Sequence, residues 1–205
     1  MAKTKMIRWV LRLGIWAWVF YWISGIFWKD LGASPALSLN HEMGEIALIL
    51  LTGNLLLGIL LDLVKPTPTW IRMWILERRF WGVSSFFVLF FHVGFYFLNE
   101  GFELKAWTQV YTKNYLIFGA LAFTLLAALA VTSNNWSIRV LKGKRWKHLH
   151  RLVYLAQFFI LIHLLLIEKA DLVKYSIWVG GLCLLQASRW IYAWIRQSQR
   201  KKSSI

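Results

Sequence analysis

Two histidines lie inside long apolar stretches of the chain. His92 follows the run FWGVSSFFVLFF, and His163 lies within LVYLAQFFILIHLLL. An ionisable side chain in the middle of a lipid-embedded segment is costly, so it is a candidate for function by default. Histidines on two helices of a bundle can bind the iron of a haem from both sides. The residue types therefore indicate a bis-histidine haem site as the chemistry to consider first.

The spacing of the two histidines from one end of their helices favours a shared site. His92 lies 13 residues after Arg79 (92 − 79), and His163 lies 13 residues after His150 (163 − 150). At 1.5 Å per residue, each is about 20 Å from that end of its helix. Equal depth is expected of two ligands of one haem. The alternative is two unrelated histidines, each hydrogen-bonded to a neighbouring helix.

His150 is a less certain haem ligand than the first two histidines. On an ideal helix it would lie roughly 140° around from His163, so a shared face needs a distorted or non-helical start. Its counterpart on the other helix falls near Arg78 or Arg79, and arginine does not bind haem iron. One complete bis-histidine site is therefore the preferred interpretation. His148, two residues from His150, points to another side of a helix and receives no role.

The remaining polar side chains suggest no catalytic chemistry. His41 lies in an expected connection between helices, where a solvated or capping histidine is the usual finding and contact with a quinol is the alternative. The sequence contains no Ser/His/Asp arrangement, glycine-rich phosphate loop or HExxH motif, so it offers no residues for hydrolase or nucleotide-binding chemistry. We assign no catalytic residue.

Composition identifies the elements that must hold these histidines as membrane helices. Of the 205 residues, 59% are apolar and only 16% are charged, whereas soluble proteins have about 45–50% apolar and about 25% charged residues. The net charge of +15 is explained by basic membrane loops rather than by a nucleic-acid partner. A single cysteine, Cys183, excludes an internal disulfide and a clustered-cysteine metal site.

The apolar segments predict an all-α integral membrane protein, a six-transmembrane-helix bundle in a single domain over residues 1–205. Each segment has close to the ~20 residues that cross ~30 Å of hydrocarbon. Between the second and third spans, the stretch from Trp70 to Ile75 is expected to form a short amphipathic helix at the membrane surface. The expected spans are 8–27, 44–64, 80–98, 115–132, 150–167 and 173–194.

The distribution of Lys and Arg predicts the orientation of the chain in the membrane. The N-terminal segment, the loop 65–79, the segment 134–151 and the C-terminal end together contain 19 of the 24 basic residues. By the positive-inside rule, these segments and both termini are cytoplasmic. The basic side chains there, which also offer an alternative role in binding lipid headgroups or a flavin phosphate, include Arg78, Arg79, Lys144 and Arg145.

The chain closely resembles the MsrQ or YedZ type of haem-binding membrane subunit, part of the ferric reductase-like transmembrane group. Subunits of this type serve the bacterial periplasmic methionine sulfoxide reductase system. The resemblance covers residues 32–194 and rests on three segments. They are ERRFWGVSSFFVLFFH ending at His92, TSN at 132–134, and LKGKRWKHLHRLVYLAQFFILIH ending at His163.

The resemblance implies a cytochrome b of the bacterial inner membrane. Electrons would pass from the quinone pool, with quinol as donor, through haem b to a periplasmic molybdopterin-containing catalytic subunit that repairs oxidised methionines. Some members are also linked to FMN and to a cytoplasmic flavin reductase. The functionally important histidines of the family correspond to His92, His150 and His163. Glu45 follows Gly44 where the family has a basic residue, so no anion-binding role is transferred there.

The function expected from the sequence is therefore electron transfer within a larger oxidoreductase system, with sulfoxide reduction carried out by the partner. Two alternatives belong to other classes. One is a self-sufficient transmembrane metalloreductase with two haems. The other is a haem-free transporter or scaffold in which the histidines relay protons or pack between helices.

Overall fold

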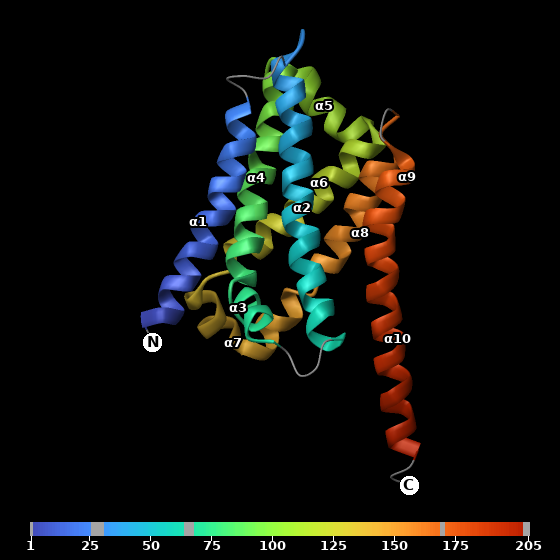
Figure 1. The fold of residues 1–205 in the computed structure, drawn as a ribbon. Coiled ribbons are helices and arrows are strands. Elements are labelled where there is room, and N and C mark those ends of the chain that lie inside the picture. Colours follow the sequence, from blue (N-terminus) through green and yellow to red (C-terminus); the bar gives the residue numbers. More distant parts are fainter. Residues whose placement is uncertain (1, 26–30, 64–67, 169–170, 203–205) are drawn as a thin grey trace. The chain divides into compact units, whose positions relative to one another are not determined.

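The described part of the chain is helical. The computed structural model describes residues 2–25, 31–63, 68–168 and 171–202, and these residues form helices joined by turns (Figure 1). This confirms the all-α class. The elements are α1 (Ala2–Ser24), α2 (Pro35–Leu63), α3 (Thr69–Leu76), α4 (Arg78–Asn99), α5 (Leu104–Thr112), α6 (Asn114–Val131), α7 (Asn135–Leu149), α8 (Leu152–Leu165), α9 (Leu172–Tyr175), the π-helix η2 (Ser176–Gly180) and α10 (Gly181–Lys202).

Several of these helices are long and apolar enough to cross a membrane. Among the described residues, Pro35–Leu60 of α2, all of α4 and all of α6 meet both conditions. Helices α7 and α8, bent by 43° at the break between them, meet the conditions as a pair. The chain is thus a membrane protein with three candidate spans, or four with the bent pair. The count of six spans and the orientation of the termini stay predictions.

The chain divides into two compact units, which are described separately. The first contains Met1–Val110 and Ala130–Val140, and the second contains Tyr111–Leu129 and Leu141–Ile205. The first unit is built around the long antiparallel contact between α2 and α4.

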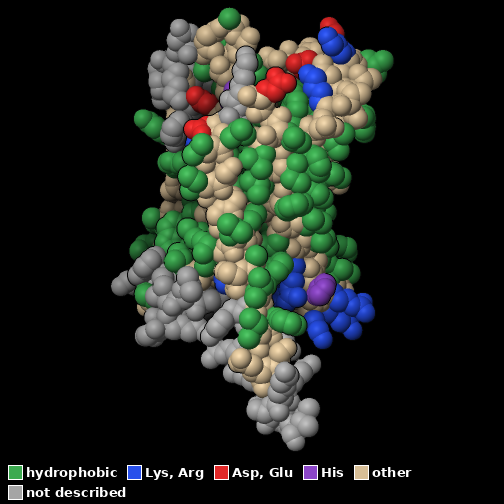
Figure 2. Space-filling view, turned by 90° about the vertical axis from the view of Figure 1, so that its right-hand side faces the viewer, with side chains coloured by type: hydrophobic (Ala, Val, Ile, Leu, Met, Phe, Trp, Pro, Cys, Tyr) green, Lys and Arg blue, Asp and Glu red, His purple; other side chains and the backbone are tan. Residues whose placement is uncertain are grey.

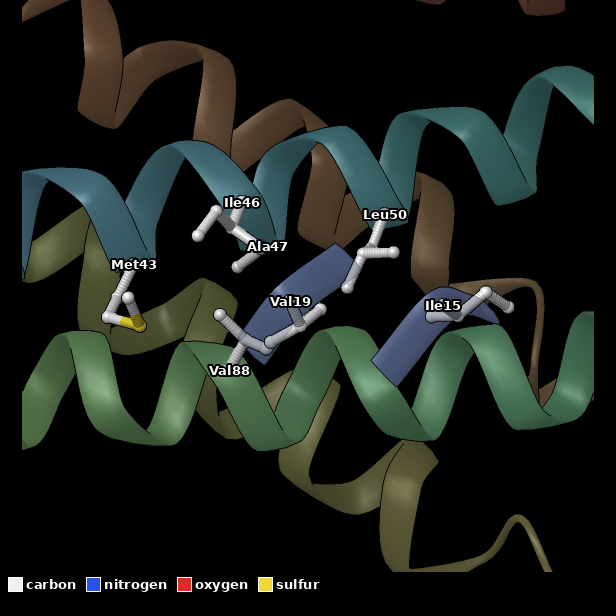
Figure 3. Close-up of a cluster of buried hydrophobic side chains, with 7 residues drawn as sticks. All are labelled: Ile15, Val19, Met43, Ile46, Ala47, Leu50 and Val88. Carbon is white, nitrogen blue, oxygen red and sulfur yellow. The ribbon is translucent and has the colours of Figure 1, made fainter. Parts of the chain in front are cut away.

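The core of the first unit is formed by aliphatic side chains where α1 lies against α2 and α4. Figure 3 shows them meeting between the three helices. Ala47 of α2 is small enough to let α4 approach closely, and its carbonyl accepts a hydrogen bond of 2.9 Å from Ser85 Oγ. The cluster consists of Ile15, Val19, Met43, Ile46, Ala47, Leu50 and Val88.

A buried ion cluster fastens α1 to the start of α4. Glu77 lies in the turn between α3 and α4, and its side chain is 0% exposed. It accepts hydrogen bonds from Arg8 Nε and from Arg12 Nε, the second at 2.6 Å. Burial alone would raise the pKa of Glu77, but the hydrogen bonds and charges of Arg12 and Arg8 outweigh it, so this pKa lies below its ordinary value.

The second unit packs α8 against α9, η2 and α10. Gln157 of α8 is buried and donates from Nε2 to Cys183 Sγ at 3.2 Å. Tyr154 and Trp190 meet edge to face, with ring centroids 4.9 Å apart. The outward side chains of α9, η2 and α10 include many large hydrophobic ones, as expected of a lipid-facing surface. Figure 2 shows hydrophobic side chains over much of one face, with Lys and Arg side chains gathered beside a His.

Several helix boundaries differ from the sequence-based expectation, and two of the differences involve histidines. Helix α2 begins at Pro35 and not at residue 44, because proline suits the first turn of a helix and the Ser34 carbonyl accepts from the next turn. His41 is therefore on a helix. Helix α8 begins at Leu152, and His150 lies in the turn before it. The short helix expected near Trp70 is present as α3.

Candidate functional site

His92 is held by two features of the neighbouring helix α2. Its ring lies against Gly44, where an added Cβ would come within 2.9 Å of Nδ1 and 3.1 Å of Cε1. Nδ1 donates to the backbone carbonyl of Asn40 at 2.7 Å. The Asn40 side chain returns a bond, because its Nδ2 donates to the His92 carbonyl at 2.6 Å. Only a glycine at position 44 leaves room for the imidazole in this place.

His163 has a matching glycine contact and carbonyl contact in the second unit. Its ring, on α8, lies against Gly119 of α6, where a Cβ would come within 3.0 Å of Nδ1. Nδ1 donates to the backbone carbonyl of Tyr115 at 2.7 Å. The arrangement around His92 is therefore repeated with other helices and other residues.

The two arrangements share one geometry. In each, the accepting carbonyl lies four residues before the glycine, one helical turn away: Asn40 before Gly44 and Tyr115 before Gly119. A carbonyl oxygen can only accept, so Nδ1 carries the proton. In a neutral imidazole the lone pair then belongs to Nε2.

This tautomer is the one that suits metal binding through Nε2. Metal-binding histidines almost always donate their other ring N–H to a carbonyl, a carboxylate or water, which fixes the ring and makes it a more basic ligand. Both His92 and His163 meet this requirement within their own units. Each histidine, described within its own unit, is thus suited to bind the iron of a cofactor such as haem.

His150 has different surroundings from the other two candidates. It lies in the turn between α7 and α8, which supplies the non-helical start considered from the sequence. Its ring stacks on Trp146, one helical turn earlier, with centroids 3.9 Å apart. His41 and His148 are exposed.

Arg78 packs against α2 at a second position of the contact between α2 and α4. It lies 14 residues before His92 (92 − 78), about four helical turns along the same helix. Gly58 lies 14 residues after Gly44 (58 − 44) on the antiparallel α2, and a Cβ there would meet the Arg78 guanidinium at 3.2 Å. Arg78 thus packs on Gly58 as His92 packs on Gly44.

Hydrogen bonds with Asn54 fix Arg78 in this position. Arg78 Nε donates to Asn54 Oδ1 at 3.2 Å, and Asn54 Nδ2 donates to the Arg78 carbonyl at 3.0 Å. A guanidinium has no lone pair to offer to iron. Arg78 therefore cannot bind iron at this position of the contact between α2 and α4.

Comparison with known proteins decides the family. Residues 43–162 match the family model described as ferric reductase like transmembrane component. The chain belongs to the ferric reductase-like transmembrane family. The matched residues extend from α2 into α8 and include His92 and His150, with His163 immediately after the end of the match.

Within this family the chain is similar to MsrQ proteins. It is 36% identical to the protein-methionine-sulfoxide reductase heme-binding subunit MsrQ of Rhodospirillum rubrum over 171 residues, which are 80% of this chain and 77% of that protein. It is 35% identical to the MsrQ protein of Brucella ovis over 165 residues, 78% of this chain and 72% of that protein. The resemblance to the MsrQ type is confirmed.

Sequence reasoning found the histidines of this ferric reductase-like chain but missed the residues that hold them. In the sequence, Gly44 marks only the expected start of the second span, Gly58 and Gly119 are ordinary members of apolar segments, and Asn40 lies in the expected connection before the second span. One signal was available for the first two glycines. Their 14-residue spacing equals that of His92 and Arg78 on the next long helix.

Proposed function

We propose that this chain is the haem-binding, electron-transferring membrane subunit of a methionine sulfoxide reductase system, with His92 and His163 as the axial ligands of one haem. The observation that carries the proposal is the repeated arrangement of histidine, glycine and backbone carbonyl. The relatives from Rhodospirillum rubrum and Brucella ovis, both described as heme-binding subunits, support it.

When bound, haem supplies an iron centre that exchanges one electron at a time between ferric and ferrous states. The residues of the chain orient and tune the ligands. The Asn40 and Tyr115 carbonyls accept hydrogen bonds from Nδ1 of His92 and His163. Each ring therefore keeps its lone pair on Nε2, the atom that would bind the iron. Gly44 and Gly119 admit the rings without displacing the helices. No catalytic residue is assigned, because sulfoxide reduction belongs to the partner.

The proposal extends to the wider electron path. The haem is haem b, quinol of the membrane pool is the donor, and a periplasmic molybdopterin-containing catalytic subunit is the acceptor. The chain crosses the bacterial inner membrane six times as a single domain, with both termini in the cytoplasm. A cytoplasmic flavin reductase with FMN is a second route of electron entry suggested by the resemblance, and we assign it no residues.

One haem per chain is preferred to two. The two-haem metalloreductase needs a second ligand on α4 besides His92, and Arg78, about four helical turns before His92, packs on Gly58 in the way that His92 packs on Gly44. The His150 ring stacks on Trp146, with ring centroids 3.9 Å apart. We therefore propose that His150 forms part of the surroundings of the haem site and does not bind a second haem together with a residue of α4.

Haem content tests the proposal directly. The purified protein should show a Soret band that shifts on reduction with dithionite, at a haem-to-protein ratio near one. His92→Ala and His163→Ala should each lose the bound haem, whereas the matched controls His41→Ala and His148→Ala, at exposed histidines, should keep it.

Each alternative function has its own outcome in this experiment. A ratio near two would favour the metalloreductase. Absence of a Soret band from protein purified with haem supplied during expression would favour a haem-free transporter or scaffold. Haem retained in both ligand variants would contradict the assignment of His92 and His163.

A further inference from the structure

The first unit contains a cavity that the proposed electron transfer does not use. It has a volume of about 220 Å³ and lies beside the start of α4. Arg8 and Arg12 of α1 line it together with Arg79 of α4. Leu76, Phe80 and Val83 form an apolar wall, and Ser133 completes the lining. The cavity thus combines three guanidinium groups with an apolar surface.

The charges around the cavity do not cancel. Arg8 and Arg12 share a single carboxylate, that of the buried Glu77. Arg79 donates from Nη1 to the neutral Asn135 Oδ1 at 2.8 Å. Three positive groups are therefore set against one negative group, and none of the described residues that line the cavity is acidic.

The arginines keep donors in addition to those used in the ion cluster. Arg8 and Arg12 contact Glu77 through Nε, while each guanidinium carries four more N–H donors on its Nη atoms. Their side chains are 38% and 31% exposed, so solvent reaches them. The N-terminal end of α4, with Arg79 and Phe80 in its first turn, adds the positive end of a helix dipole.

These features match a phosphate group attached to an apolar molecule. Guanidinium groups bind phosphate oxygens in pairs, and a helix start favours the same charge. Leu76 is 57% exposed and Val83 is 39% exposed, which gives acyl chains a surface to cover. The cavity also lies at one end of α4, a candidate membrane span, which is the depth of lipid headgroups.

From this combination we propose that the cavity binds the phosphate of an anionic phospholipid. An anionic lipid is favoured over a zwitterionic one because it brings no ammonium group near the three arginines. The bound lipid links α1, which supplies Arg8 and Arg12, to α4, which supplies Arg79. The site is independent of haem binding, so the two proposals can fail separately.

Native mass spectrometry of the full-length protein in detergent tests the site. The probes are phosphatidylglycerol and phosphatidylcholine, and the variant is Arg79→Gln, which removes one guanidinium and leaves the Glu77 cluster intact. We expect wild type to retain phosphatidylglycerol in preference to phosphatidylcholine, and Arg79→Gln to bind it about tenfold more weakly. The matched control is Arg72→Gln, an equal charge change at an exposed residue of α3 that does not line the cavity.

A second variant and a second probe complete the test. Val83→Trp fills the cavity without changing charge and should also weaken retention of phosphatidylglycerol. If the cavity binds free phosphate and not the phosphate of a lipid, inorganic phosphate should raise the thermal unfolding temperature of wild type and Arg72→Gln but not of Arg79→Gln. The protein should then show no preference between the two lipids. Equal lipid retention in all four proteins, together with no effect of phosphate, would overturn the proposal.

Discussion

Two imidazole rings in this protein occupy space that is open only because the facing residue is glycine. His92 and His163 each lie where a neighbouring helix has glycine, and each donates to a carbonyl one turn before that glycine. The glycine admits the ring, and the carbonyl sets its tautomer. Each site therefore consists of three groups, of which only the histidine looks reactive in the sequence.

A methyl group at position 44 is expected to disturb the site. In Gly44→Ala the new Cβ would come within 2.9 Å of His92 Nδ1, so the ring must move and its bond to the Asn40 carbonyl weakens. We expect a lower haem-to-protein ratio, measured by absorbance. Gly94→Ala is the control, because nothing lies within 4 Å of a Cβ there. Equal haem content in both variants would show that the glycine contact does not matter.

The buried carboxylate of Glu77 is expected to make stability depend on pH. Its pKa is lowered in the folded protein, so its contribution is present above the ordinary value of 4.5 and is lost as the pH falls through the folded value. Glu77→Gln should destabilise the protein at neutral pH by about 1–3 kcal/mol. This loss of stability is smaller than that expected for a fully buried ion pair, because Arg8 and Arg12 are partly exposed.

Thermal unfolding at several pH values would test the role of Glu77. The difference in stability between wild type and Glu77→Gln should shrink as the pH falls below about 4.5. Glu103→Gln, at an exposed residue, is the control and should match wild type throughout. A difference that stays constant with pH would contradict a lowered pKa for Glu77 in the folded protein.

At the level of elements, helices α2 and α4 contact each other at two positions where a glycine of α2 faces a large side chain of α4. Gly44 faces His92 at one of them, and Gly58 faces Arg78 at the other. The same packing thus supports a proposed iron ligand at one level and a structural cation at the other.

Loss of Arg78 should weaken the contact between α2 and α4 without removing haem. Arg78→Ala deletes the bond from Nε to Asn54 Oδ1 and the contact with Gly58, which is expected to cost about 1–2 kcal/mol. The thermal unfolding temperature should fall while the haem-to-protein ratio stays near one. Arg72→Ala on α3 is the control. A loss of haem in Arg78→Ala alone would instead place this arginine in the haem site.

Periodicity and composition predicted the helices better than the contacts between them. The long apolar runs indicated α2, α4 and α6 directly, because apolar length alone decides whether a helix suits a membrane. The start of α2 was missed because Ser38 and Asn40 interrupt the apolar signal. The role of Gly44 could not be read from its own segment, since it depends on which helix lies opposite.

For the whole molecule, fusion reporters test the predicted orientation. Because Lys and Arg concentrate in alternate connections, a green fluorescent protein fused to either terminus should fluoresce. Alkaline phosphatase inserted near Lys105 should be active outside the inner membrane, and the same insertion near Lys144 is the inactive control. An active phosphatase at the C-terminus would require an odd number of spans.

The carbonyl bonds at the two histidines also bear on how charge moves through the membrane. Each Nδ1 proton is held by a backbone oxygen, which cannot release a proton of its own. As the proposed iron ligands, His92 and His163 would therefore be poor proton donors or acceptors when the oxidation state of the iron changes. In the proposed electron transfer these two residues should then exchange no hydrogen ion, and they should add no pH dependence to the midpoint potential around neutral pH.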